Sequence, residues 1–139
     1  MGTEVTHCGG HGAGQVVKIL NNMVLFMTGQ ALAEALAIAR RAGVDGKLLF
    51  EVMAKGSSDS FALRNHGLKA MVPGVFPADA FPVDYAIKDI TLALDLAAQG
   101  GVTAQGARTA HELLQAASRA GFTTEYWPVV AKVVEGAKT

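Results

Sequence analysis

A lysine and an asparagine, Lys18 and Asn22, are the two residues whose types and spacing best suit chemistry. They are four positions apart, so in a helix they lie on one face, one turn from each other. A cationic donor presented beside an amide suits a substrate that carries a carboxylate or a hydroxyl group. The alternative interpretation is structural: a lysine whose stem packs along an amphipathic helix, next to a solvated asparagine. Spacing alone favours the structural interpretation, because lone pairs of this kind are common.

Three glycines, Gly10, Gly12 and Gly14, precede this pair. They allow the backbone to turn sharply and another surface to approach closely. A glycine-rich dinucleotide-binding turn, however, needs a β-strand in front of it and a βαβ unit around it. Val5 is the only β-branched aliphatic residue among the first nine positions. The glycines by themselves are therefore no evidence for a nucleotide site.

The elements that must position these residues are predicted to be helices. An apolar, alanine-rich stretch over residues 14–42 predicts one long helix on the order of 40 Å. Because it is apolar on nearly every face, we expect it to be buried, within its own domain or between subunits. The sequence thus predicts an all-α fold, a single domain over 1–139 with about six helices around one long central helix. The further helices are predicted over 46–55, 61–71, 83–99, 107–120 and 125–134.

Residues at the predicted helix ends support these boundaries. Gly43 suits the position just after the long helix, and Asp45 suits the N-cap of the next one. The serine-rich loop over 56–60 can either cap the following helix or line a site, and capping is the commoner role.

Composition and charge limit the classes of partner that we expect for this chain. Lysine plus arginine equals aspartate plus glutamate at twelve each, so no nucleic-acid partner is indicated. Only 17% of residues are charged, which predicts apolar surface that a partner covers; we expect a homodimer. No membrane span is expected, because Lys18, Asn21, Asn22, Gln30 and Glu34 interrupt the apolar stretch.

The single cysteine, Cys8, excludes an intrachain disulfide and predicts a reducing, cytoplasmic location. It lies near His7 and His11, which together are possible metal ligands. Their spacing matches no zinc motif, and no second cluster completes the set, so loop residues are the favoured interpretation and no metal is predicted.

Two motifs in order along the chain resemble the C-terminal domain of the β-hydroxyacid dehydrogenases. That family includes 3-hydroxyisobutyrate dehydrogenase, tartronate semialdehyde reductase, L-threonate dehydrogenase and, more distantly, 6-phosphogluconate dehydrogenase. The resemblance covers nearly the whole chain. The residues that carry it are Gly12, Gly14, Lys18 and Asn22 in the first motif, Lys88, Asp89, Leu92 and Ala93 in the second, and Gly43-Val44-Asp45, the serine-rich turn and Gly121 around them.

The resemblance implies that Lys18 is the catalytic lysine, which exchanges a proton with the substrate hydroxyl while hydride moves to or from a nicotinamide. It implies that Asn22 binds the substrate, a small 3-hydroxy acid or its semialdehyde. Gly12 and Gly14 are then the glycines at which the substrate cleft comes close to the backbone.

The resemblance also implies that Lys88 reaches the cofactor or substrate and that Asp89 positions it. The cofactor would be NAD or NADP, held mainly by an N-terminal Rossmann domain that is absent from this chain. Because a nicotinamide enzyme needs that domain, the alternative function is a non-catalytic helical dimerisation or interaction domain. Tyr126 and Trp127 depart from the family pattern by adding bulk near the C-terminus, which affects specificity or packing.

Overall fold

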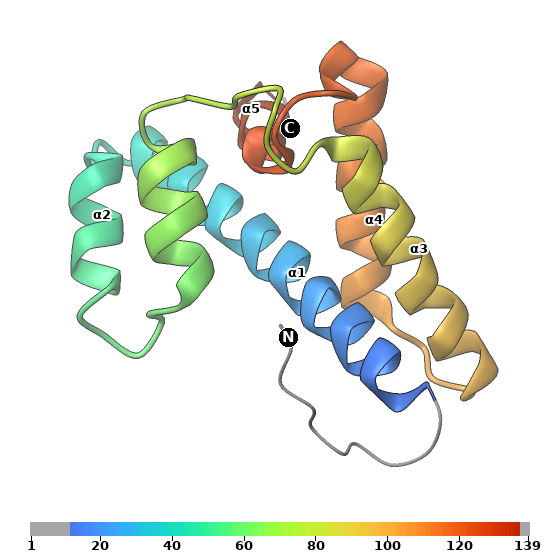
Figure 1. The fold of residues 1–139 in the computed structure, drawn as a ribbon. Coiled ribbons are helices and arrows are strands. Elements are labelled where there is room, and N and C mark those ends of the chain that lie inside the picture. The colour runs from blue at the N-terminus through green and yellow to red at the C-terminus, as the bar shows by residue number, and fades with distance from the viewer. Residues whose placement is uncertain (1–11, 137–139) are drawn as a thin grey trace.

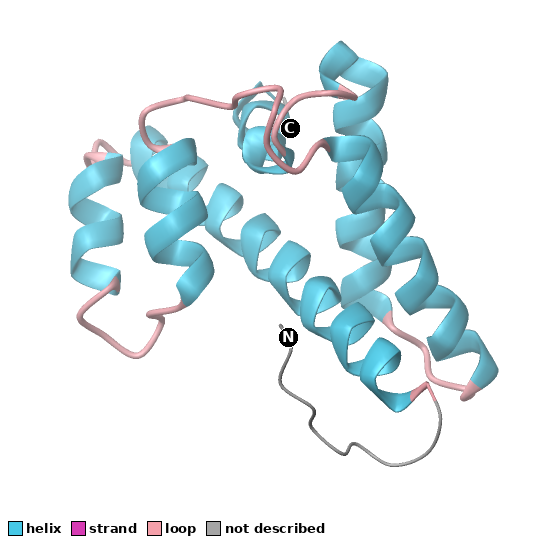
Figure 2. Cartoon of the chain, viewed as in Figure 1, coloured by secondary structure: helices cyan, strands magenta, loops and turns pink. Residues whose placement is uncertain are grey.

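The fold is all-α, as the sequence predicts (Figures 1 and 2). The structure is a computed structural model, and it describes residues 12–136. The sequence-based interpretation of His7, Cys8, His11 and Gly10 therefore lies outside the described residues. The helices are α1 (Ala13–Arg41), α2 (Gly46–Met53), the π-helix η1 (Leu63–Met71), α3 (Val83–Gln99), α4 (Gln105–Ala117), the π-turn η2 (Ser118–Phe122), the 3-10 turn η3 (Trp127–Val129) and α5 (Val130–Gly136).

The 29-residue helix α1 is the axis of the domain, and the other long elements pack along it (Figure 1). Towards its C-terminal end it contacts the pair formed by α2 and η1, and α3 and α4 lie side by side along the rest of it. The core is built on apolar side chains of α1 such as Phe26, Leu32 and Leu36, which pack against buried residues of every other long helix. The predicted long central helix is confirmed.

The predicted helix caps are present. Gly43 has φ +83°, the left-handed conformation expected directly after the end of a helix. The carboxylate of Asp45 accepts a hydrogen bond from the backbone N–H of Leu48 at 3.0 Å. In the serine-rich loop, the hydroxyl of Ser60 accepts from the backbone N–H of Leu63 at 3.0 Å, so this serine has the capping role.

Within this chain α1 is not buried on every face. Its buried residues all lie between Phe26 and Ala39, whereas Val16, Leu20, Val24 and Ile38 are exposed. This agrees with the apolar surface that the low charge content predicts, because the remaining helices are too few and too short to surround a helix of this length. By length and composition α1 could also cross a membrane, contrary to the sequence-based expectation. The core helix of a water-soluble domain passes the same test, and α1 carries the core here.

The C-terminal segment differs from its prediction. A helix predicted over 125–134 begins later, because residues 123–127 pair with the N-terminal end of α3 instead. The backbone N–H of Trp127 donates to the carbonyl of Phe81 at 2.9 Å, and that of Val83 donates to the carbonyl of Glu125 at 2.9 Å. The helix predicted over 107–120 begins at Gln105. Its α-helical part ends at Ala117 and passes into η2, where Gly121 has φ +98°.

Candidate active site

An open cleft of about 260 Å³ between α1 and α3 brings the two sequence motifs together. Lys18 and Asn22 reach it from α1, and Lys88 and Asp89 reach it from the first turns of α3. Of the predicted site residues, these four therefore share one cleft, although the motifs are far apart in the chain. The cleft is lined by Lys18, Asn22, Phe81, Tyr85, Lys88 and Asp89.

A direct hydrogen bond joins the two motifs. The side-chain amide of Asn22 donates from Nδ2 to Oδ2 of Asp89 at 2.9 Å, in a partly buried position. An asparagine amide has two N–H donors and a carbonyl acceptor, so this bond orients the group and leaves capacity for a ligand. The aspartate thereby fixes the rotamer of the amide in the cleft.

Both lysines of the cleft are exposed, so a ligand can reach them. The ammonium group of Lys88 lies 5.8 Å from the ring centroid of Tyr85, within the range of a cation–π contact that holds it over the cleft wall. Two cations face a single carboxylate, Asp89, which already accepts a hydrogen bond. The cleft therefore suits an anionic ligand.

The two glycines of the first motif lie at the N-terminal end of α1. Gly12 has φ +86°, a conformation that favours glycine, and it directly precedes the helix. A Cβ atom built on Gly12 or on Gly14 meets no atom of residues 12–136 within 4 Å. The space beside both backbones is open to a group from outside the described chain.

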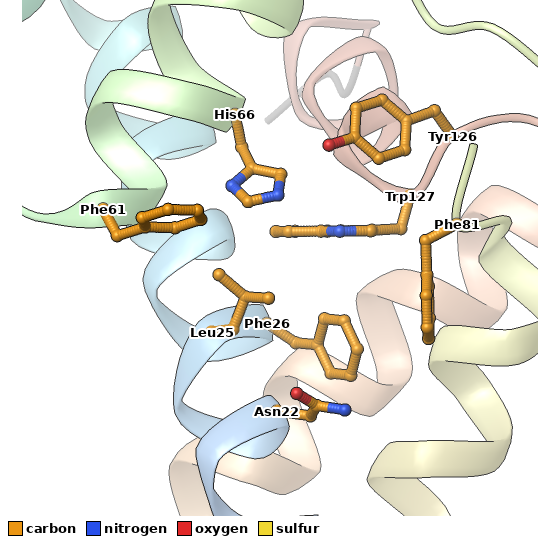
Figure 3. Close-up of a pocket in the computed structure, with 8 residues that line it drawn as sticks. All are labelled: Asn22, Leu25, Phe26, Phe61, His66, Phe81, Tyr126 and Trp127. Carbon is orange, nitrogen blue, oxygen red and sulfur yellow. The ribbon is translucent and has the colours of Figure 1, made fainter. Parts of the chain in front are cut away.

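A second hollow, which we call the aromatic chamber, adjoins the cleft (Figure 3). Its volume is about 180 Å³, and it shares Asn22 and Phe81 with the cleft. Helix α1 forms one side, residues of η1 and the turn before it form a second, and the 123–127 segment forms a third. The chamber is lined by Asn22, Leu25, Phe26, Phe61, His66, Phe81, Tyr126 and Trp127.

The indole ring of Trp127 contacts other aromatic rings that line the chamber. It meets Phe26 edge to face with centroids 5.2 Å apart, and the ring of His66 lies 5.0 Å from it. His66 is 7% exposed, and its Nδ1 has no hydrogen-bond partner among the described residues. Burial lowers the pKa of His66 from its ordinary value, so the ring is neutral at pH 7.

Only part of this chamber could be predicted from the sequence. Tyr126 and Trp127 are expected there to affect specificity or packing, and both line the chamber. Phe61, His66 and Phe81 were missed, because no sequence spacing relates the helix that carries Phe61 and His66 to the segment that carries Phe81. They meet only because the backbone near Phe81 pairs with the segment that carries Trp127.

No metal site is evident within residues 12–136, where no three histidine, cysteine, aspartate or glutamate side chains gather closely enough to hold an ion.

Comparison with known proteins gives this arrangement a context. Residues 12–127 match the family model described as the NAD-binding domain of NADP-dependent 3-hydroxyisobutyrate dehydrogenase. The chain belongs to this family. It corresponds to the C-terminal domain of the NAD(P)-dependent β-hydroxyacid dehydrogenases, as the two motifs imply.

Curated members of the family are similar in sequence. The chain is 42% identical over 102 residues to 3-hydroxyisobutyrate dehydrogenase of Pseudomonas aeruginosa, which covers 68% of this chain and 33% of that protein. It is 32% identical over 135 residues to 2-(hydroxymethyl)glutarate dehydrogenase of Eubacterium barkeri, which covers 97% of this chain and 44% of that protein. The chain thus spans a third to somewhat under half of the length of these relatives.

Solved structures agree with the fold. A 3-hydroxyisobutyrate dehydrogenase from Salmonella typhimurium superposes with a TM-score of 0.82 at 30% identity, over 88% of this chain and 42% of that one. The Mycobacterium tuberculosis enzyme, in a structure with L-serine, superposes with a TM-score of 0.82 at 27% identity, over 93% of this chain and 46% of that one.

Proposed function

We propose that this chain is the catalytic and substrate-binding half of an NAD(P)-dependent β-hydroxyacid dehydrogenase. Its substrate would be a small 3-hydroxy acid or the corresponding semialdehyde. The observation that carries the proposal is the convergence of Lys18, Asn22, Lys88 and Asp89 on one cleft, with the two motifs joined by the Asn22–Asp89 hydrogen bond. Family membership supports the reaction class.

Lys18 has the proton-transfer role in this proposal. A bound nicotinamide supplies hydride chemistry, and the hydroxyl proton of the substrate must move in step with it. In the oxidation direction the amine form of the lysine takes that proton, and in the reverse direction its ammonium group polarises the carbonyl. Asn22 holds the substrate oxygen or carboxylate without adding charge.

Lys88 and Asp89 complete the cleft on the side of α3. The ammonium of Lys88 is an attractive partner for the phosphates of NAD or NADP or for the substrate carboxylate, which fits the cationic balance of the cleft. The resemblance implies that Asp89 positions Lys88, but its carboxylate accepts a hydrogen bond from Asn22, so the role that we assign to Asp89 is to hold that amide in place. Lys88 and Asp89 are therefore compatible with a nicotinamide cofactor that is bound mainly by another domain.

The partners that follow from this proposal are a Rossmann domain and a second copy of the chain. The Rossmann domain would hold most of the cofactor and close the cleft over Gly12 and Gly14, where space is open. Exposed apolar residues on α1 would face a partner subunit in a homodimer. We also propose a cytoplasmic location, which rests on the single cysteine alone.

The second candidate function is a non-catalytic helical dimerisation or interaction domain derived from the same family. The exposed apolar stripe on α1 is the observation in its favour. It gives no reason, however, for two lysines, an amide and a carboxylate to line one cleft.

The test is hydride transfer by a protein in which this chain is joined to a dinucleotide-binding domain. Nicotinamide reduction would be followed with 3-hydroxy-2-methylpropanoate for the wild type and for Lys18→Ala. The substitution should lower the rate by a factor on the order of 10²–10⁴, the usual effect of a lost acid–base group. Lys55→Ala, an exposed lysine outside the cleft, is the matched control. A rate for Lys18→Ala within about threefold of the wild type would remove Lys18 from the mechanism.

A further inference from the structure

The aromatic chamber contains a feature that the proton-transfer chemistry leaves unused. His66 is buried among Phe61, Tyr126 and Trp127, with ring centroids 6.0, 5.8 and 5.0 Å from its own (Figure 3). Its Nδ1 is buried without a partner in the described chain. Buried polar atoms in native proteins are nearly always paired with protein, water or ligand. The chamber therefore contains a buried polar group that apolar packing does not explain.

The helix that carries His66 also has an unusual conformation. His66 lies in η1, which is π-helical over nine residues, Leu63–Met71. Helices of this kind are rare and occur frequently at functional sites. Directly before η1, Phe61 leaves 64% of its surface exposed at the lip of the chamber. A ring or branched group bound in the chamber would cover one face of Phe61.

The charge of the chamber limits what it can hold. Its polar groups are the Asn22 amide, the Tyr126 hydroxyl, the Trp127 N–H and the imidazole of His66, and no charged side chain lines it. Lys69, a nearby cation, lines a neighbouring hollow on the other side of His66 instead and donates to Asn65 at 3.2 Å. A carboxylate placed in the chamber would lose its hydration without gaining a cation.

The size of the chamber is informative as well. An apolar cavity of about 150 Å³ is large enough to take benzene. The chamber has about 180 Å³, it is walled by aromatic rings, and it adjoins the cleft, with which it shares Asn22 and Phe81. A substrate whose carboxylate and hydroxyl lie at Lys18 can therefore extend a ring-sized or branched group into it.

We propose that the chamber binds the substituent on the carbon that carries the substrate carboxylate, and that this substituent is uncharged and apolar, up to the size of a phenyl ring. The inference rests on the proposed function, because the cleft fixes which end of the substrate enters. Phe61, His66 and Trp127 are the residues that determine specificity. The neutral wall formed by His66 selects against acids with a second carboxylate.

Trp127 is the only tryptophan in the chain and lies in the chamber, so its fluorescence reports occupancy directly. Three acids with the same reacting part would be titrated into the chain: 3-hydroxy-2-phenylpropanoate, 3-hydroxy-2-methylpropanoate and 2-(hydroxymethyl)butanedioate. The phenyl acid should bind at least about tenfold more tightly than the diacid, the usual discrimination of an apolar pocket. The methyl acid should fall between them. Equal or tighter binding of the diacid, or no response to any of the acids, overturns the proposal.

Three variants sharpen the test. Phe61→Ala should weaken binding of the phenyl acid by about tenfold, because an aromatic wall is lost. His66→Arg places a cation in the chamber and should reverse the preference towards the diacid; circular dichroism checks that this variant folds. If it does not fold, Phe61→Ala still decides. Lys69→Met, outside the chamber, should leave the preference unchanged, and a drop in diacid binding in this variant would assign substituent recognition to Lys69 instead.

Two further outcomes separate this inference from the proposed function. If the joined protein reduces nicotinamide with hydroxy acids but prefers the diacid, only the chamber assignment fails. If no 3-hydroxy acid is oxidised while the phenyl acid still shifts Trp127 fluorescence, the dehydrogenase proposal fails and the chamber remains a binding site for an aryl acid. Quenching of Trp127 by nicotinamide mononucleotide that the phenyl acid cannot displace would assign the chamber to the cofactor and overturn the proposal.

Discussion

Asn22 on α1 donates a 2.9 Å hydrogen bond to Asp89 on α3, across 67 positions of sequence. The bond links the long central helix α1 to α3, the helix that carries Lys88. It lies in the cleft in which Lys18 and Lys88 are both exposed. The asparagine is therefore held by the second motif and is not a solvated surface residue. The structural interpretation of the Lys18 and Asn22 pair does not account for this bond.

The strength of this bond can be measured by a double-mutant cycle. Asn22→Ala, Asp89→Ala and the double variant would be unfolded in urea, and the coupling free energy should be about 1 kcal/mol, since the acceptor is charged but only partly buried. Gln15, which is exposed near the start of the same helix, provides the control pair with Asp89 and should show no coupling. A coupling indistinguishable from that control would mean that the bond does not persist in solution.

The packing of α1 against Trp127 gives a second prediction. A Cβ atom on Gly29 would collide with Cζ3 and Cη2 of the indole ring, and Trp127 is 2% exposed and packed against the rings of Phe26 and His66. Gly29→Ala should therefore lower the free energy of unfolding by about 1–3 kcal/mol, the usual cost of overpacking. The measurement is urea unfolding followed by circular dichroism.

Gly14→Ala is the matched control for that experiment. Gly14 is also a helical glycine of α1, but a Cβ there meets nothing within 4 Å. Alanine at this position should be neutral or stabilising by up to about 1 kcal/mol, because it restricts the unfolded chain. A Gly29→Ala variant as stable as Gly14→Ala would show that the indole can shift away from α1.

Much of the fold follows from local pattern. The apolar run, Gly43 and Asp45 were enough to place α1 and the start of α2, because helix periodicity and caps depend on neighbouring residues. The late start of the C-terminal helix could not be predicted in this way. It depends on backbone pairing between Phe81 and Trp127, and sequence spacing says nothing about such long-range contacts.

The candidate site, like the fold, could be predicted from the sequence only in part. The spacing of Lys18 and Asn22 drew attention to them, but the roles of these two residues and of Lys88 and Asp89 were implied by the two motifs that resemble the family. That the two motifs share a cleft came only from the packing of α1 on α3. His66 gave no signal at all, because a lone histidine in a helix of mixed polarity is uninformative until its surroundings are known.

The burial of His66 predicts a pH dependence of stability. Its pKa in the folded chain is lowered by burial, whereas in the unfolded chain it stays near 6.5. Between these two values the unfolded chain binds more protons, so stability rises with pH. The stabilisation is fully present above about pH 6.5 and is lost as pH falls towards the folded-state pKa.

Urea unfolding at several pH values from 7.5 down to 5, roughly the window set by an ordinary histidine, measures this effect. One proton contributes a slope of at most about 1.4 kcal/mol per pH unit. His66→Phe keeps an aromatic ring in place and removes the titration, so it should lose less stability on acidification than the wild type. Identical slopes for the two proteins would show that His66 is not held neutral by the fold.

The exposed stripe on α1 gives the last prediction, which concerns association. Val16, Leu20 and Val24 are spaced by four, so they lie on one face of α1, and between 37% and 55% of each is exposed. Apolar residues aligned in this way on a long helix suit a self-complementary contact with a second copy, the commonest closed assembly. We expect a homodimer that packs through this stripe.

Light scattering over a range of concentrations would measure the mass, which should be twice the 14.4 kDa of one chain. Leu20→Glu puts a charge in the middle of the stripe and should reduce the mass to that of the monomer, because a buried unpaired carboxylate is costly. Val102→Glu is the matched control, since Val102 is 62% exposed in the turn after α3, away from the stripe. A mass of 14.4 kDa for the wild type at every concentration would contradict the dimer, and equal disruption by both variants would place the contact elsewhere.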